Sequence, residues 1–95
     1  MEQNLIEIDD HDIYSFIIDL GKNPLIILKG RNGYVMTEHL DITTANKLGD
    51  IAGIIQNEPT VKDALNSRII KLSTKAKQKG LRVGMKSGDF LIAIS

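Results

Sequence analysis

The dipeptide Asn32-Gly33 lies between two apolar runs, and no other short feature constrains the fold of this 95-residue chain as strongly. A type I′ turn needs positive φ at both of its central residues, and Asn-Gly is a pair that adopts this conformation readily. The runs on either side, Leu25–Lys29 and Tyr34–Thr37, are therefore predicted to be strands that pair as an antiparallel hairpin. The chain must then contain a β-sheet.

Two more strands are predicted before this hairpin. The segment 5–8 is a short apolar run, and the acidic stretch Asp9–Asp12 ends it as a turn. Ile13–Leu20 is rich in β-branched and aromatic residues, as strands are, and Gly21–Pro24 follows as a second turn. We expect these strands to extend the sheet of the hairpin.

After the hairpin, the pattern changes to one that favours helices. A helix capped by Asp41 or Thr43 is predicted to end at Gly49, and the apolar segment Ile51–Ile55 is predicted to be a strand. A final helix is predicted to open at Lys86 or Ser87.

The longest predicted helix runs from about Thr60, its N-cap, to Lys79, with Gly80 in the left-handed position that follows a helix. Its apolar face is formed by residues spaced four, three and four apart: Leu65, Ile69, Leu72 and Ala76. Asn66 and Ser67 are the point at which this segment could divide into two helices.

These elements predict one domain over residues 1–95 with a mixed α+β fold. Its N-terminal part is antiparallel strands, including the Asn-Gly hairpin, and helix–strand–helix elements pack on that sheet. A chain of 95 residues suffices for one hydrophobic core and not for two. Aromatic residues make up only 4% of the chain, so the core is expected to be aliphatic.

The composition excludes several classes of function. The chain has no cysteine, which excludes disulfides, thiolate catalysis and zinc sites built on cysteine. No apolar run approaches the roughly 20 residues of a membrane span, and residues 1–12 lack a signal-peptide pattern. We therefore expect a soluble cytoplasmic protein that has no cofactor and does not contact a membrane.

The charges balance, with twelve basic and twelve acidic side chains. A local basic stretch nevertheless runs over residues 71–86. It has two interpretations, a solvated helix face or a binding patch. Nucleic acid is the least favoured partner, because the chain has no overall basic excess and no aromatic side chains stand among these lysines.

Neither histidine has the surroundings of a catalytic or metal site. His11 lies among Asp9, Asp10 and Asp12, but their spacing matches no defined metal loop, so a solvated turn is predicted there. His39 comes at the end of a predicted strand, and the adjacent Glu38 would point to the opposite face. We assign no catalytic residue and no metal ligand.

Residues 84–88 lead into the last predicted helix and could bind an anion through free backbone N–H groups, although capping and close packing are the favoured explanation of this stretch. A candidate ligand site joins this junction to the end of the hairpin strand. Its residues would be Thr37, His39, Gly84, Lys86, Ser87 and Gly88. Whether the two junctions meet in space depends on the fold.

The sequence also resembles a small family of bacterial and archaeal proteins of unknown function, the YunC-like proteins. The similarity spans residues 25–94 and rests on the order of its segments, which are Gly33-Tyr34-Val35-Met36 before Leu40-Asp41, Thr60-Val61-x-Asp63-x-Leu65, Lys75-Ala76-Lys77, Gly80-Leu81-x-Val83-Gly84-Met85, and Leu91 in the last helix. Many relatives carry Cys in place of Thr37 and Gly in place of Glu38, so a thiol function would be absent here. The Arg that relatives carry near the C-terminus is not kept. The resemblance implies a compact α/β-containing domain with no assigned activity.

Two functions remain open on this evidence. The first is a binding or interaction module that associates with itself, because sheets of this size often leave an edge or a face that a second subunit covers. The alternative is an enzyme or a protein that binds a small anionic ligand at the site joining 37–39 to 84–88.

Overall fold

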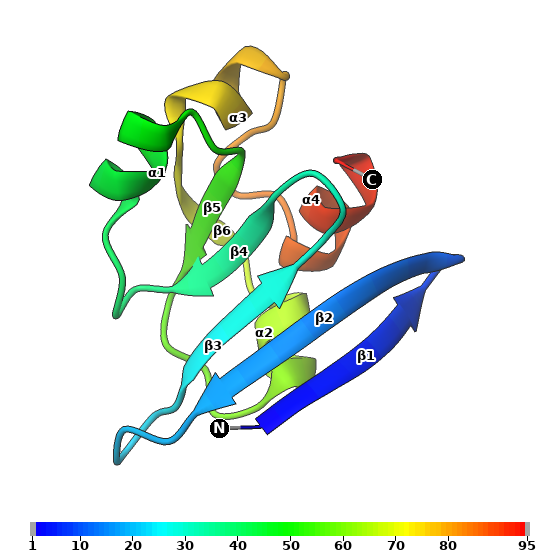
Figure 1. Ribbon diagram of the computed structural model, residues 1–95, viewed down its shortest axis with the longest axis vertical. Coiled ribbons are helices and arrows are strands. Elements are labelled where there is room, and N and C mark those ends of the chain that lie inside the picture. The colour runs from blue at the N-terminus through cyan, green and yellow to red at the C-terminus, as the bar shows by residue number, and fades with distance from the viewer. Residues whose placement is uncertain (1, 95) are drawn as a thin grey trace.

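The computed structural model describes residues 2–94 as a six-stranded sheet with four helices (Figure 1). The strands are neighbours in chain order: β1 (Glu2–Ile8), β2 (His11–Ile18), β3 (Leu25–Lys29), β4 (Tyr34–Thr37), β5 (Ala52–Ile55) and β6 (Ile69–Leu72). Neighbouring strands are antiparallel, except that β4 and β5 are parallel. The predicted mixed α+β class and its N-terminal antiparallel strands are confirmed.

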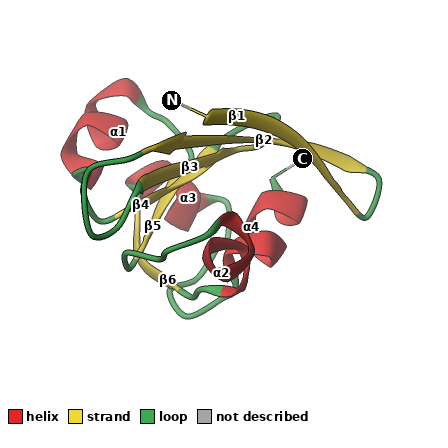
Figure 2. Ribbon diagram, turned by 90° about the horizontal axis from the view of Figure 1, so that it is seen from below, coloured by secondary structure: helices red, strands yellow, loops and turns green. Residues whose placement is uncertain are grey.

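The helices are α1 (Ile42–Leu48), α2 (Val61–Asn66), α3 (Thr74–Gln78) and α4 (Ser87–Ala93). The crossover that two parallel strands require is supplied by α1, which packs beside β5. One face of the sheet is covered by α2 and α4, and β1 to β3 lie on the opposite side of the molecule from them (Figure 2). The helices α2 and α4 therefore lie under one face of the sheet, and α1 packs on the opposite face, beside β4 and β5.

The core lies between the sheet and the helices α2 and α4. Ile13, Leu28 and Val35 lie on the same face of β2, β3 and β4, and all three are fully buried. Leu28 and Val35 are directly opposite each other in the pairing of β3 with β4. On the helix side of the core, α4 contributes Phe90 and Leu91, which are also fully buried. Aliphatic residues make up most of this core, as the composition predicts.

The prediction of one helix from Thr60 to Lys79 is wrong. The chain forms α2, then the strand β6, then α3, with Ser67 extended after α2 and Ser73 capping α3. The spacing of four, three and four residues arises because three short elements each direct apolar side chains into one core. The β-branched residue Ile69 instead pairs with β5, where it lies opposite Ile55.

The hairpin of β3 and β4 is confirmed, but its predicted type I′ turn is wrong. Neither Asn32 nor Gly33 has positive φ. The hairpin that does show the type I′ signature is β1–β2, whose two loop residues Asp9 and Asp10 have φ of 48° and 68°. Short polar side chains such as Asp tolerate this left-handed conformation better than most.

The ends of the other helices follow the sequence. Asp41 caps α1 by accepting a hydrogen bond from the Thr43 backbone N–H, and Gly49 closes it with φ of 73°. The last helix starts at Ser87 as predicted, and Gly80 is left-handed with φ of 86°.

Candidate functional site

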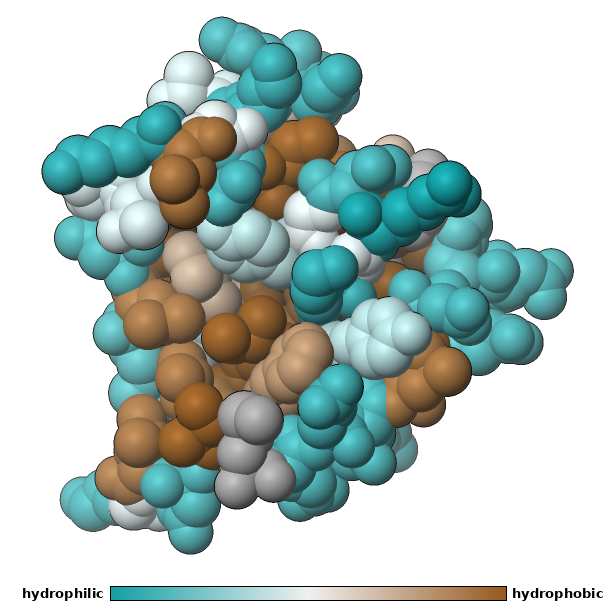
Figure 3. All heavy atoms as spheres, viewed as in Figure 1, coloured by the Kyte–Doolittle hydropathy of each residue, from teal (hydrophilic) through white to brown (hydrophobic). Residues whose placement is uncertain are grey.

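One face of the sheet carries apolar side chains that no helix covers over β1, β2 and β3. Strand register places these side chains in cross-strand rows, because residues paired across strands point to the same side. The rows contain Leu5 with Tyr14, Phe16 with Ile27 and Met36, and Ile18 with Leu25. We call the six of these residues that lie on β1, β2 and β3 the open face, since Met36, on β4, continues one row but is buried. Figure 3 shows apolar side chains gathered on this side of the molecule.

Exposure distinguishes the open face from the core. Leu5 retains 59% of its accessible surface and Tyr14 retains 42%, whereas Ile13, which points to the other side, retains none. Sequence reasoning missed this face. The available signal was that both alternating sets of β2 contain large apolar side chains, namely Ile13 and Ile17 on one side and Tyr14, Phe16 and Ile18 on the other.

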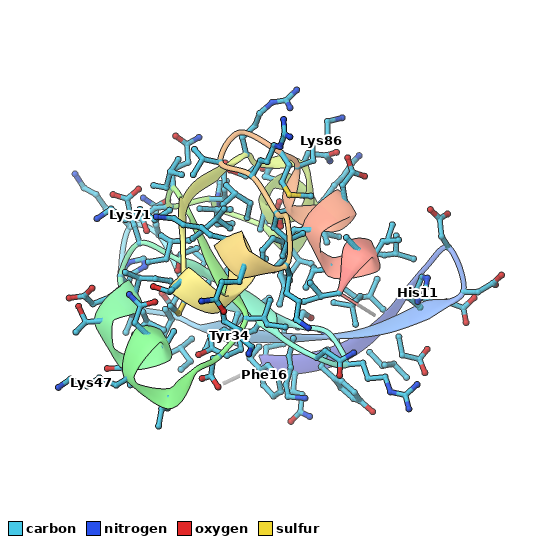
Figure 4. The ribbon with its side chains drawn as sticks, turned by 90° about the horizontal axis from the view of Figure 1, so that it is seen from above. His11, Phe16, Tyr34, Lys47, Lys71 and Lys86 are labelled. Atoms are coloured by element: carbon cyan, nitrogen blue, oxygen red, sulfur yellow. The ribbon has the colours of Figure 1, made fainter. Side chains whose placement is uncertain are left out.

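A hollow of about 500 Å³ continues the open face between β3, β4 and α1. Apolar side chains make up most of its wall, and they are Ile27, Met36, Leu40 and Ala45. Tyr34 lines it too, and Lys29 and Asp41 are its charged residues. Figure 4 shows Tyr34 and Phe16 toward the same side of the molecule.

Tyr34 is held in this hollow by a hydrogen bond from its hydroxyl to Oδ2 of Asp50, at 2.7 Å. Asp50 directly precedes the segment that enters β5, so the parallel pairing of β4 with β5 brings the two residues together. Burial raises the pKa of Tyr34 from 10.0 to about 12, and the hydrogen bond to Asp50 and its negative charge act in the same direction. The phenol is therefore kept protonated as a donor.

This contact predicts the alkaline titration of the folded protein. The pKa of Tyr34 is higher in the folded chain than in the unfolded one, so its contribution to stability is complete below pH 10 and is lost as the pH rises through 12. In the Tyr14→Phe protein, Tyr34 is the remaining tyrosine, and near-ultraviolet absorbance should show its phenolate forming near pH 12. Asp50→Asn should move that transition toward pH 10; an unchanged midpoint would contradict the assigned contact.

Thr37 and His39, predicted as site residues, are brought into contact. Thr37 is fully buried at the end of β4, and its Oγ1 lies 3.1 Å from Nδ1 of the exposed His39. The same oxygen accepts a hydrogen bond from the backbone N–H of Ile26 at 3.2 Å. Sequence reasoning placed both residues at a strand end without finding this bond.

The other half of the predicted site, residues 84–88, lies at the same end of the sheet but beyond β5 and β6. Thr37 is next to Ile55, Ile55 is next to Ile69, and the Ile69 N–H donates to the Met85 carbonyl at 2.9 Å. Three inter-strand spacings of about 4.8 Å put roughly 14 Å between the two junctions. The structure thus does not bring Thr37 and His39 together with Gly84.

The remaining predicted residues of this junction serve packing and pairing. Lys86 is exposed, and its backbone forms an isolated antiparallel β-bridge with that of Arg68, just before β6. Gly84 has a positive φ of 95°. Ser87 is buried, with its N–H donating to the Ser67 carbonyl at 2.8 Å. A Cβ at Gly88 would lie 3.4 Å from the Leu65 carbonyl oxygen, so this glycine lets α4 approach α2.

The basic stretch 71–86 does not form one helix face. Lys71 is on β6, Lys75 and Lys77 are on α3, and Lys86 precedes α4. Figure 4 shows Lys71 and Lys86 apart from each other. Within residues 2–94, no three His, Asp or Glu side chains converge as a metal site would require, and no helix is long and apolar enough to cross a membrane.

Comparison with known proteins gives one relative by structure. The crystal structure of TA1206, a protein of unknown function from Thermoplasma acidophilum, matches 99% of this chain and 92% of its own, with a TM-score of 0.91 and 31% sequence identity. No family model and no curated protein matches the chain. The match confirms the fold over almost the whole length of both chains.

Proposed function

The chain belongs to the same family as the Thermoplasma acidophilum protein TA1206, and from this premise we propose that it is an interaction module that associates with itself through the open face. The observation that carries the proposal is the row of exposed apolar side chains on β1 and β2, where Leu5 and Tyr14 keep 59% and 42% of their surface. Contiguous apolar surface of this kind marks sites of association. The resemblance to the YunC-like proteins stays a prediction and adds no activity.

The charge of the molecule favours a second copy as the partner. Twelve basic and twelve acidic side chains leave no net charge, so two copies do not repel one another as they approach. In a two-fold contact, a residue that meets a second residue of the other copy has its own counterpart met in the same way, so each such pair occurs twice. Lys29 and Asp41 line the same hollow beside the open face, so each copy offers both members of such a pair.

The edge of the sheet supports the same partner. Among the described strands, β1 pairs only with β2, so its outer backbone N–H and C=O groups have no strand beside them. The apolar row of the open face continues to this edge through Leu5. A second copy that covers the open face can therefore also shield β1.

Light scattering across micromolar concentrations tests the proposal. We expect a mass above that of the 10.5 kDa monomer for the wild type and the monomer mass for the double variant Leu5→Glu/Tyr14→Glu, because charges buried in a contact without partners oppose association. Val83→Glu is the matched control, since Val83 is 58% exposed and lies outside the open face. A monomeric wild type across this range would refute self-association.

A further inference from the structure

The Thr37 hydroxyl connects three segments and gives His39 a fixed orientation. It bonds to the start of β3 through the Ile26 N–H and to the ring of His39 through Nδ1. A turn closed by the hydrogen bond from the Leu40 N–H to the Thr37 carbonyl, at 3.2 Å, folds the ring back onto this hydroxyl. A completely buried group thus orients an exposed side chain.

The donors and acceptors at this contact bear on which nitrogen of the His39 ring carries the proton. A threonine hydroxyl has one hydrogen to donate. Among the hydrogen bonds of residues 2–94, the Thr37 side chain has Ile26 and His39 as its partners, and the Ile26 N–H can only donate. The Ile26 N–H occupies one of the two lone pairs of the hydroxyl oxygen, and we infer that the hydroxyl hydrogen is directed to Nδ1, which places the proton of the neutral imidazole on Nε2.

His39 lines a second hollow, of about 370 Å³, between the turn that follows β4 and the strands β5 and β6. Lys71 on β6 and the carboxylates of Glu38 and Asp41 also line it, and Ile54 and Ile70 are among its apolar residues. The pKa of Asp41 is lowered, mainly by its hydrogen bonds from Thr43, and the positive charge of Lys71 contributes. Opposite charges and an apolar wall thus share one small site.

We propose that this hollow binds a small zwitterion with an aliphatic side chain, whose carboxylate accepts hydrogen bonds from His39 Nε2 and Lys71 Nζ. Glu38 and Asp41 then face the ammonium group of the ligand, and Ile54 and Ile70 face its side chain. A simple anion would meet two carboxylates, and a simple cation would meet Lys71, whereas a zwitterion complements both. The inference does not depend on self-association.

Nuclear magnetic resonance of the ¹⁵N-labelled protein tests the site with leucine as the probe. His11 is the only other histidine and serves as an internal reference. We expect leucine to shift the signals of His39 and Lys71 to saturation while His11 stays unchanged, and Lys71→Gln to weaken binding about tenfold or more. Lys47→Gln, an exposed lysine on α1, is the matched control and should bind as the wild type does.

Two analogues separate the zwitterion from its parts. The molecule 4-methylpentanoate lacks the ammonium group and 3-methylbutylamine lacks the carboxylate, so each should bind at least about tenfold more weakly than leucine. Equal binding of either analogue overturns the proposed ligand class. The absence of any saturable shift at His39 with leucine overturns the site itself.

The positioning role of Thr37 has its own spectroscopic readout. In the wild type, the ¹⁵N shifts of His39 should show an unprotonated Nδ1 and a protonated Nε2, and Thr37→Ser should preserve both this tautomer and leucine binding. Thr37→Val should lose the tautomer preference and weaken leucine binding about threefold to tenfold. A protonated Nδ1 in the wild type overturns the assigned role, and this measurement requires no variant to fold.

Discussion

The Gly33→Ala protein is expected to unfold at least about 12 °C below the wild type, which corresponds to a loss of about 3 kcal/mol or more in the free energy of unfolding. A Cβ at position 33 would lie 2.3 Å from the backbone oxygen of Ile51 and 2.8 Å from Cδ1 of Ile94. The Ile51 oxygen accepts the hydrogen bond from the Tyr34 N–H at 3.0 Å. The backbone at Ile51 cannot retreat without breaking this bond, with which the pairing of β4 and β5 begins.

Gly30→Ala is the matched control, because it adds the same methyl group in the same loop. Its Cβ would meet its nearest neighbours, Leu91, Gly33 and Ile13, at 3.5–3.7 Å, which is ordinary contact. Neither glycine has positive φ, so backbone strain is the same small term in both. Thermal unfolding should leave Gly30→Ala within about 1 kcal/mol of the wild type. Equal losses in the two proteins would contradict the proposed clash.

Gly33 also shows what the sequence could and could not predict about the fold. Asn-Gly between apolar runs predicted the pairing of β3 with β4, since that pairing depends on residues close in the chain. The need for glycine comes instead from Ile51, which approaches only after β5 has packed parallel to β4. The local sequence thus predicted the hairpin correctly, but it attributed Gly33 to the turn conformation instead of to the close approach of Ile51.

The prediction of one helix over residues 60–79 is wrong for a similar reason. A helix and a run of short elements can place apolar residues at the same intervals, and periodicity alone does not separate them. What decides the outcome is that Ile69 pairs with Ile55 on β5, a contact between residues fourteen positions apart. The short polar residues Ser67 and Ser73 mark the breaks, and the sequence indicates only the first of them, at Asn66 and Ser67.

In the candidate site, too, contacts between residues close in the chain differ from contacts that depend on the fold. Thr37 and His39 are two residues apart, and their contact is local. The distance from them to residues 84–88 depends on β5 and β6 lying between, and the bond from Tyr34 to Asp50 depends on the parallel register. A single sequence contains no direct signal for either arrangement.

The second large effect is expected for Ser73→Ala, with a loss of about 3 kcal/mol in the free energy of unfolding. The Ser73 hydroxyl is fully buried and makes three hydrogen bonds. It donates to the Asp50 carbonyl at 2.7 Å and accepts from the N–H groups of Ala52 at 3.0 Å and Ala76 at 3.2 Å. One side chain therefore caps α3 and fixes the start of β5, and alanine would leave three backbone groups without this partner.

Thr60→Ala separates these two roles of Ser73. Thr60 caps α2 through one hydrogen bond, accepted from the Asp63 N–H at 3.1 Å, and it is exposed. Removal of an exposed cap typically costs about 1 kcal/mol, so urea denaturation should show Ser73→Ala losing about three times as much as Thr60→Ala. Equal losses would mean that Ser73 acts only as a helix cap. A larger loss means that the loop from Asp50 to Ala52, which also positions the partner of Tyr34, depends on a residue that follows β6.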